Sequence, residues 1–191
     1  MARVKSADKR NAILTAATQV VAERGVGATT AAIAGRAQVS EGTIFTYFAS
    51  KDELLNQLYR ELKLELADAM MSGFPRRNGV RSRLQHVWNC YVDWGVENPF
   101  KHKALQQLIL WSGLTDESKA AGMAPFVEIQ QMHREATESR IFRELPEEFA
   151  AATMSALSET TVAFMQQQSE QAAIYRDLGF EMLWAAIARK K

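Results

Sequence analysis

Residues 40–48 read Ser40-Glu41-Gly42-Thr43-Ile44-Phe45-Thr46-Tyr47-Phe48, and this stretch decides the fold of the N-terminal part of the chain. Ser40 is a favoured N-cap residue, so it predicts a short helix from Glu41 to about Tyr47. Ile44 and Phe48 are four positions apart, which places both on one face of that helix, directed toward a core. The stretch therefore predicts one helix of a small helical domain.

The opposite face of the same helix has a different character. Thr43, Thr46 and Tyr47 project from it, and Gly42 allows close approach. Glu41 is its only long acidic side chain. A face with hydroxyl groups and little bulk suits insertion into a groove.

A second short helix precedes this one. Thr29 or Thr30 caps it, and Ile33 is among its inward residues. A tight turn at Gln38-Val39 joins the two helices, which gives a helix-turn-helix geometry. The pattern alone is equally consistent with a small helical bundle that binds no ligand.

Longer helices flank the pair. Apolar spacing predicts one over about residues 8–24 with Gly25 as its stop, and Ser50 with Glu53 forms a capping box that starts another. Lys51 lies in the first turn of that helix, where a cation opposes the helix dipole at a cost of roughly a few tenths of a kcal/mol. A phosphate group at this N-terminus would compensate for it.

Together these residues resemble the DNA-binding domain of the TetR family of bacterial transcriptional regulators, over roughly the first 60 residues. The resemblance rests on Gly25, Thr29-Thr30-Ala31-Ala32-Ile33-Ala34, the run from Ala37 to Phe48, and Lys51-Asp52-Glu53-Leu54. It implies an all-helical homodimer whose N-terminal domains bind a palindromic operator in double-stranded DNA. It also implies a C-terminal domain that binds a small inducer, usually with relief of repression.

The resemblance also assigns residues to the DNA interface, with the recognition helix at Ser40–Tyr47. The candidate phosphate contacts are Thr30, Thr43, Tyr47 and Lys51. The residues expected nearest the base edges are Ser40, Glu41, Gly42 and Thr46.

Two residues depart from the family pattern. Gln38 stands in the turn where Gly is common, so it either takes a left-handed conformation at a cost of about 1 kcal/mol or changes the turn. Phe45 stands where Tyr is frequent, so one possible hydroxyl contact is missing.

Basic residues near the N-terminus form a separate candidate site. They either add backbone or minor-groove contacts or belong to a frayed, solvated tail. They are Arg3, Lys5, Lys9 and Arg10.

The composition fits a globular protein with a basic N-terminal module. The chain has 191 residues, 47% hydrophobic and 24% charged, with a formal net charge of +1. Up to Lys51, seven basic and three acidic residues give +4, which leaves −3 for the rest. Such an excess is typical of a module that meets a polyanion, although ordinary solvated surfaces show it too.

Cys90 is the only cysteine, which rules out an intrachain disulfide and a Cys-rich zinc site and favours a reducing compartment. His86 and Cys90 make half of a metal site at most, so we expect no metal and no cofactor. The sequence shows no N-terminal signal segment and no apolar run of membrane-spanning length, so we expect a cytoplasmic protein that meets no membrane.

We expect an all-α fold of two domains. Residues 1–50 form the helix-turn-helix DNA-binding domain, a connecting helix covers about residues 50–71, and residues 72–191 form a helical effector-binding and dimerisation domain. The pattern beyond residue 79 predicts helices at about residues 80–97, 100–111, 125–142, 146–168 and 170–189, with a looser stretch around Gly113 and Gly122.

The C-terminal domain contains tryptophan and methionine side chains at helical spacing. Such stripes are usually core, yet these large or flexible side chains also suit a cavity that adapts to an apolar or aromatic guest. The predicted pocket is lined by Trp88, Tyr91, Trp94, Leu108, Trp111, Met123 and Phe126. Asp93, Glu97 and Glu128 could neutralise a cationic ligand or face solvent, and we favour solvent for Glu97.

The last two helices have the character of a dimerisation surface, because small residues permit close packing and apolar residues supply area. The predicted interface includes Ala152, Ala156, Phe164, Gly179 and Leu183. The alternative is packing within one chain.

We therefore expect a ligand-responsive, homodimeric repressor of a palindromic operator that a small apolar or aromatic effector releases. The alternative is an activator or an architectural DNA-binding protein without an inducer. An enzyme is disfavoured, since the sequence has no phosphate-binding loop, no His-Glu-x-x-His motif and no evident pair of nucleophile and base.

Overall fold

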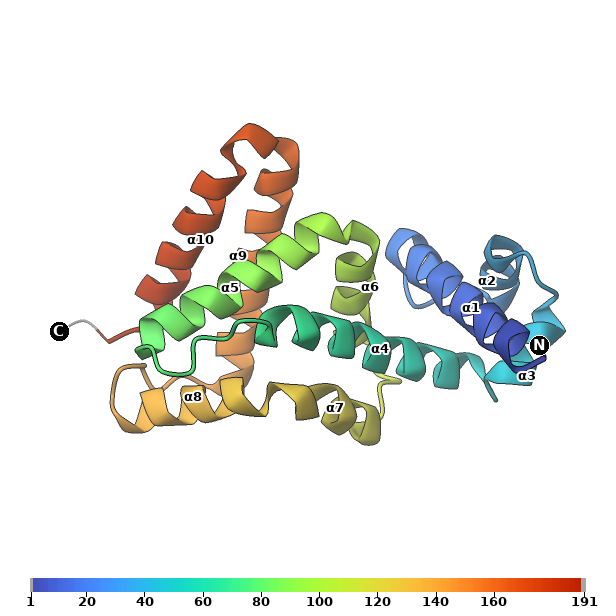
Figure 1. Cartoon of the computed structure of the whole chain (residues 1–191), viewed down its shortest axis with the longest axis horizontal. Coiled ribbons are helices and arrows are strands. Elements are labelled where there is room, and N and C mark those ends of the chain that lie inside the picture. Colours follow the sequence, from blue (N-terminus) through green and yellow to red (C-terminus); the bar gives the residue numbers. More distant parts are fainter. Residues whose placement is uncertain (1, 190–191) are drawn as a thin grey trace. The chain divides into compact units, whose positions relative to one another are not determined.

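The structure, a computed structural model, describes the backbone of residues 2–189 and the side chains of residues 7–146, 149–150 and 152–189. Every named element in this range is a helix, which confirms the all-α prediction (Figure 1). The α-helices are α1 (Ala2–Arg24), α2 (Thr30–Ala37), α3 (Glu41–Tyr47), α4 (Lys51–Met71), α5 (Val80–Glu97), α6 (Pro99–Ile109), α7 (Asp116–Met123), α8 (Val127–Glu138), α9 (Glu147–Gln167) and α10 (Ala172–Ile187).

The chain divides into two compact units. The first comprises Met1–Glu65 and Asn98–Pro125, and so contains α1 to α3, the first part of α4, α6 and α7. The second comprises Leu66–Glu97 and Phe126–Lys191, with the rest of α4, α5 and α8 to α10. The helix-turn-helix thus shares its compact unit with two helices from later in the chain. The functional domains expected at residues 1–50 and 72–191 remain a prediction.

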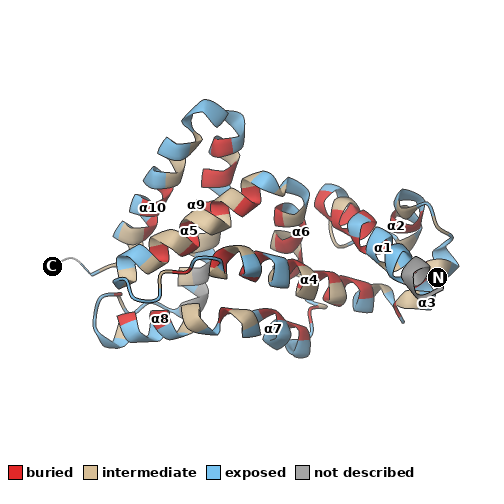
Figure 2. Cartoon of the chain, in the orientation of Figure 1, coloured by how far each residue is buried: buried red, intermediate tan, exposed pale blue. Residues whose placement is uncertain are grey.

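The core of the first unit forms along α1, which packs against both α2 and α6. Ile13, Ala17 and Val20 recur at helical spacing and are at most 1% exposed. Figure 2 shows buried segments in red along α1. Gly25 ends α1 with φ +84°, a left-handed conformation that favours glycine. The predicted stop at Gly25 is confirmed, although α1 begins well before the predicted residue 8.

The second unit is built on α5, which packs against α9 and α10. Gly179 of α10 makes the closest approach, because a Cβ there would lie 2.7 Å from Trp88 Cζ2 and 2.3 Å from Thr161 Oγ1. The Trp88 indole N–H donates to the Arg176 carbonyl at 2.9 Å. These contacts join α5, α9 and α10 into one tightly packed group.

One helix was not predicted. α7 occupies the stretch expected to be loose, and Thr115 caps it by accepting a hydrogen bond from the Ser118 N–H at 3.1 Å. Gly122 lies inside this helix because the Tyr59 ring leaves no room for a side chain: a Cβ would lie 2.6 Å from Tyr59 Cε1. The glycine marks a close approach of helices rather than a break.

Three other helix ends differ from the predicted ones. α8 stops at Glu138 rather than residue 142, because Arg140 adopts φ 56° and turns the chain. Pro146 is the N-cap of α9 rather than its first residue. α10 begins at Ala172, after a short 3₁₀ turn.

Candidate nucleic-acid interface

Hydrogen bonds at each helix end hold the turn between α2 and α3. The Thr29 hydroxyl caps α2 by accepting from the Ala32 N–H at 3.2 Å. Gln38 then takes the left-handed conformation, with φ 55° and ψ 42°, and the Val39 N–H donates to the Ala34 carbonyl at 3.0 Å. The sequence allowed this conformation or a different turn, and the structure shows the former.

Helix α3, the predicted recognition helix, has one buried and one exposed face. Ser40 caps it, since its hydroxyl accepts from the Thr43 N–H at 3.2 Å. Ile44 is fully buried and Phe48 is 3% exposed, so the predicted inward residues anchor the helix. The outer residues Glu41, Gly42, Phe45 and Thr46 are exposed, and Thr43 and Tyr47 are half-buried.

Several predicted contact residues lie side by side around α3. Thr30 of α2 donates its hydroxyl hydrogen to Glu41 Oε1, which links the two helices. Ser40 Oγ lies 2.8 Å from Thr43 Oγ1, and Thr46 donates to a backbone carbonyl one turn earlier at 3.2 Å. A hydroxyl has a single hydrogen, so in this arrangement Thr30 and Thr46 keep lone pairs that can accept from a base amino group but have no hydrogen left to donate to a phosphate oxygen.

The start of α4 follows α3 after three residues. The Ser50 hydroxyl accepts from the Glu53 N–H at 3.1 Å, which confirms the Ser50 half of the predicted capping box. The Glu53 carboxylate pairs with Arg60 at 3.2 Å rather than with the Ser50 N–H. Lys51 is the first residue of α4 and is half-buried. Lys51 and Tyr47 therefore stand at the two helix ends that meet beside the exposed face of α3.

Arg10 does not belong to a basic arm. It donates to Glu61 at 2.6 Å, and its guanidinium lies 5.7 Å from the centre of the Phe48 ring. It therefore braces the helix-turn-helix core. The side chains of Arg3 and Lys5 lie outside the described residues.

An ion pair joins α2 to α1. Arg36 donates to both carboxylate oxygens of Glu23, at 3.1 and 2.7 Å, and to Gln19 at 3.1 Å. The hydrogen bonds from Arg36 lower the pKa of the Glu23 carboxyl below its ordinary value. The Arg36 guanidinium is thus paired within the protein. Lys51 is the basic residue among the predicted DNA contacts.

Sequence analysis missed a buried amide that ties α4 to the loop before α7. Asn56 is 3% exposed, and its Nδ2 donates to the Asp52 carbonyl at 2.9 Å and the Gly113 carbonyl at 3.1 Å. Its Oδ1 accepts from the Thr115 N–H at 3.0 Å. Only the position of Asn56 among the buried leucines of α4 could have signalled this role.

The residues of the predicted effector pocket are distributed over both compact units. Trp88 is 0% exposed, and Trp94, Leu108 and Phe126 are also buried. Met123 is 40% exposed. Tyr91 and Trp111 are half-buried, and burial raises the pKa of the Tyr91 hydroxyl. Trp88 is thus a core residue of the second unit.

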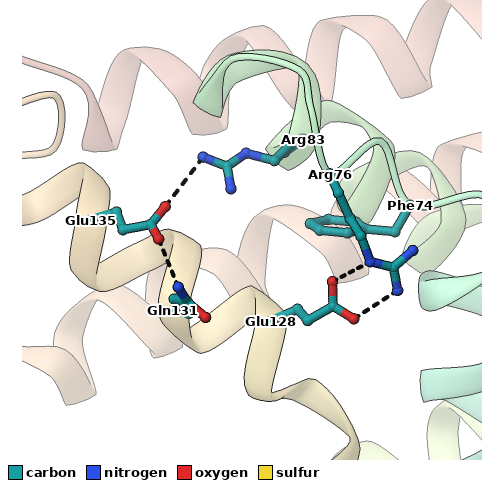
Figure 3. A pocket seen from close by; sticks show the side chains of 6 residues that line it. All are labelled: Phe74, Arg76, Arg83, Glu128, Gln131 and Glu135. Atoms are coloured by element: carbon teal, nitrogen blue, oxygen red, sulfur yellow. Dashed lines mark hydrogen bonds and ion pairs between the residues drawn. The ribbon is translucent and has the colours of Figure 1, made fainter.

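A cavity of about 350 Å³ lies in the second unit and is lined by other residues (Figure 3). They are Phe74, Arg76, Arg83, Glu128, Gln131 and Glu135. Arg76 holds Glu128 by two hydrogen bonds, at 2.6 and 2.7 Å, and these bonds lower the pKa of the Glu128 carboxyl. Glu128 is therefore already paired, as is Asp93 with Arg176 at 2.9 Å, whereas Glu97 is exposed.

The predicted dimer positions fall into two groups. Ala152, Ala156 and Phe164 are exposed on α9. Gly179 is buried and Leu183 is 2% exposed, because both pack inside the second unit. These two positions serve packing within the chain, which was the alternative the sequence left open.

Cys90 is half-buried, with its Sγ 3.5 Å from His86 Nε2. Burial, and then the charge of Asp93, raise the pKa of the Cys90 thiol, which opposes thiolate chemistry.

Among the side chains that the structure describes, no group of three His, Cys, Asp or Glu residues is placed to hold a metal ion. In the same part of the chain, no helix combines the length and apolar character that crossing a bilayer requires.

Comparison with known proteins finds relatives that share the helix-turn-helix segment. The family model described as "Bacterial regulatory proteins, tetR family" matches residues 13–58. The HTH-type transcriptional regulator YhgD of Bacillus subtilis is 33% identical over 84 residues, which cover 41% of this chain and 44% of the relative. The HTH-type transcriptional regulator BetI 1 of Chromohalobacter salexigens is 32% identical over 107 residues, which cover 54% and 52%. The matches thus span about half the length of these relatives.

A solved structure extends the likeness over the whole fold. The crystal structure of a Shewanella sp. PV-4 protein, described as a tetR family transcription regulator, has a TM-score of 0.81 and 27% identity. The similarity covers 95% of this chain and 99% of that one. Fold and site together define the class, which is that of helix-turn-helix transcriptional regulators. Residues 13–58 match the TetR family model, and the fold of the chain is similar to that of a TetR family regulator.

Proposed function

We propose that this chain is a homodimeric, ligand-responsive repressor that acts in the cytoplasm on a palindromic operator. The observation that carries the proposal is the exposed face of α3, which presents Glu41, Gly42 and Thr46 beside the capped start of the helix. Recognition helices of this kind lie in the major groove with their N-terminal residues at the base edges. A small, mostly polar face on a firmly anchored helix suits that position.

The proposed contacts divide into two roles. Thr43, Tyr47 and Lys51 bind phosphate oxygens, which fixes the register of the protein on the duplex. Thr30, predicted beside them, donates its hydroxyl hydrogen to Glu41 and would have to turn it away to donate to a phosphate oxygen. Ser40, Glu41, Gly42 and Thr46 lie at the base edges, which carry the sequence information. The position of Lys51 at the first turn of α4 supports its role, because an anion there offsets the unfavourable interaction of this cation with the helix dipole.

Dimerisation is proposed to use α9 and α10. Ile174, Leu178 and Met182 of α10 are 54–63% exposed and follow one another at four-residue intervals, so they share one face. On α9, Phe149 and Phe164 are 64% and 41% exposed. Two copies of this surface, related by a two-fold axis, would bury these side chains in a four-helix bundle.

A charge placed on α10 tests the interface. Leu178→Lys is expected to shift the protein from dimer to monomer in light scattering after size exclusion. Leu64→Lys on α4 is the matched control, because Leu64 is 53% exposed and Leu178 is 54% exposed. A dimer that survives Leu178→Lys, or dissociates equally with Leu64→Lys, would place the interface elsewhere.

The effector is proposed to be a small apolar or aromatic molecule. It acts by binding one conformation of the C-terminal helices more tightly than another, since only differential affinity shifts an equilibrium. In the repressing conformation the two recognition helices match successive major grooves, about 34 Å apart. The effector-bound conformation no longer matches them.

Selection of random duplex DNA by the purified protein at near-physiological salt tests the proposal as a whole. An enriched inverted repeat with half-sites about one helical turn apart is the expected result. The enriched duplex then serves as the probe in a screen for molecules that release it. A folded dimer that enriches no sequence would contradict the proposed function.

Three substitutions separate the two roles. Tyr47→Phe and Lys51→Ala are expected to weaken binding to every sequence alike, and Lys51→Ala also to flatten the dependence of affinity on salt. Thr46→Ala is expected to change the sequence preference. Equal loss of specificity in all three variants would contradict these roles.

A further inference from the structure

The exposed face of α3 has an unusual set of functional groups for a helix that reads DNA. The residues Glu41–Tyr47 include no Arg, Lys, Asn or Gln, which are the side chains that form bidentate bonds with guanine or adenine. The exposed side chains are instead a carboxylate at Glu41, an aromatic ring at Phe45 and a hydroxyl at Thr46. The Thr46 hydroxyl donates to the backbone of α3. Glu41 and Phe45 are left as the two large groups that this face presents.

The Glu41 carboxylate is held in place for contact. It belongs to the first residue of α3, and the Thr30 hydroxyl donates to its Oε1. A carboxylate accepts several hydrogen bonds and donates none, so one bond from Thr30 orients it without saturating it. In the major groove it is repelled by the guanine and thymine acceptors, whereas the cytosine N4 amino group donates to it. Adenine offers a donor as well, but its neighbouring N7 acceptor opposes a carboxylate.

The Phe45 ring offers no hydrogen bond. It is 48% exposed, although Ile44 and Phe48 on either side of it are buried. Phe45 follows Glu41 by four positions, so the two side chains share one face of α3. The thymine C5-methyl group is the apolar feature of the major groove that a phenyl ring can contact.

We infer that Glu41, positioned by Thr30, selects a cytosine and that Phe45 selects a thymine in the same half-site. This inference rests on the proposed function. Four residues of helix rise about 6 Å and base pairs stack about 3.4 Å apart, so the two bases lie within about two base pairs of each other. Neither base is selected through a bidentate arginine or lysine contact from α3.

The experiment is selection from random duplex DNA with wild-type protein, Glu41→Gln and Phe45→Ala, sequenced in parallel at one salt concentration. Wild-type protein is expected to enrich cytosine and thymine at two positions of each half-site. Glu41→Gln is expected to change the preferred cytosine to adenine, because an amide bonds to adenine N6 and N7. Phe45→Ala is expected to lose the thymine preference alone. Each change is expected to alter relative affinity for the two bases by about tenfold.

Matched controls exist elsewhere in the first unit. Glu117→Gln also changes an exposed acid in the first turn of a helix, and Phe100→Ala removes a ring that is 47% exposed. Both are expected to leave the selected sequence unchanged. The variants are compared at equal folded concentration by circular dichroism, and the wild-type preference tests the inference even if a variant fails to fold.

The outcomes separate the inference from the proposed function. An inverted repeat without the cytosine and thymine, or one that Glu41→Gln and Phe45→Ala leave unchanged, overturns the inference and keeps the proposed function. In that case Glu41 serves the fold alone, through the bond from Thr30 and the N-terminal end of the helix dipole. Absence of any enriched sequence contradicts both.

Discussion

The helix-turn-helix and the α5–α9–α10 group are held together in different ways. In the helix-turn-helix, Ser40 and Thr29 each bond to a backbone N–H three residues later. In the α5–α9–α10 group, Trp88 bonds to the Arg176 carbonyl, 88 residues away. Structure in the first region follows from neighbours in sequence, whereas structure in the second depends on how distant helices pack. Four experiments with substituted proteins test this difference.

The largest effect is expected from Trp88→Ala. The side chain is fully buried and donates a hydrogen bond to the Arg176 carbonyl, so its removal leaves a cavity and loses that bond between helices. The free energy of unfolding is expected to fall by about 3–5 kcal/mol. Urea denaturation followed by circular dichroism measures the loss, with Phe100→Ala as a control on a half-exposed ring. A loss below about 1 kcal/mol would mean that Trp88 lines a space that tolerates change, as an effector pocket does.

The aromatic residues show where sequence-based prediction stopped. Sequence alone placed Trp88 in a stripe of α5 but could not say which neighbours fill the space around it. Caps and spacing within ten residues predicted α2, α3 and the start of α4 closely, because those signals are local. Gly122 was misinterpreted for the same reason, since the Tyr59 ring that excludes a side chain there lies 63 residues earlier in the sequence.

The same difference explains the candidate site. The order Ser40, Glu41, Gly42 was sufficient to place the exposed face of α3. The hydrogen bond from Thr30 to Glu41 crosses between helices, and no local pattern predicts it. The Asn56 amide likewise bonds to partners 57 and 59 residues away. Prediction from sequence therefore fails where hydrogen bonds connect distant helices.

Gly179→Ala tests how strongly close packing between helices limits the second unit. The added Cβ would overlap Thr161 and the Trp88 ring, both fixed by their helices, so a loss of about 1–3 kcal/mol in unfolding free energy is expected. Gly35→Ala in α2 is the control, because nothing lies within 4 Å of a Cβ there and alanine favours a helix by up to about 1 kcal/mol. A similar gain in both variants would show that helix propensity outweighs packing in α10.

The pH dependence of stability tests whether Lys63 of α4 is buried. Burial lowers the pKa of the Lys63 ammonium from 10.5 to about 8. Between about pH 8 and 10 the unfolded chain binds more protons than the folded one, so stability is expected to rise with pH in this window. The expected gain is about 1–2 kcal/mol, and below pH 8 this lysine contributes no slope.

Lys63→Met is the comparison variant. It keeps an unbranched side chain one atom shorter and removes the titrating group, so the rise between pH 8 and 10 is expected to disappear. Chemical denaturation of both proteins at several pH values measures the difference in slope, which also cancels the contributions of the buried tyrosines. Parallel pH profiles for the two proteins would show that Lys63 is solvated and that α4 is less covered than the structure indicates.

The smallest effect is expected at two turn residues. It tests whether the energetic cost of the same backbone conformation differs between the two regions. Gln38 in the helix-turn-helix and Arg140 after α8 adopt nearly the same left-handed φ, 55° and 56°. Glycine avoids the steric strain of that conformation but also has more freedom to lose on folding, so Gln38→Gly and Arg140→Gly are each expected to stabilise by about 0.5–1 kcal/mol. Shifts in the urea midpoint measure both. Equal gains would show that backbone strain depends only on the residue and its φ and ψ. A gain in stability for Arg140→Gly with a loss for Gln38→Gly would show that the glutamine side chain stabilises the turn. The helix-turn-helix would then depend on a side-chain interaction besides the hydrogen bonds of its helix caps.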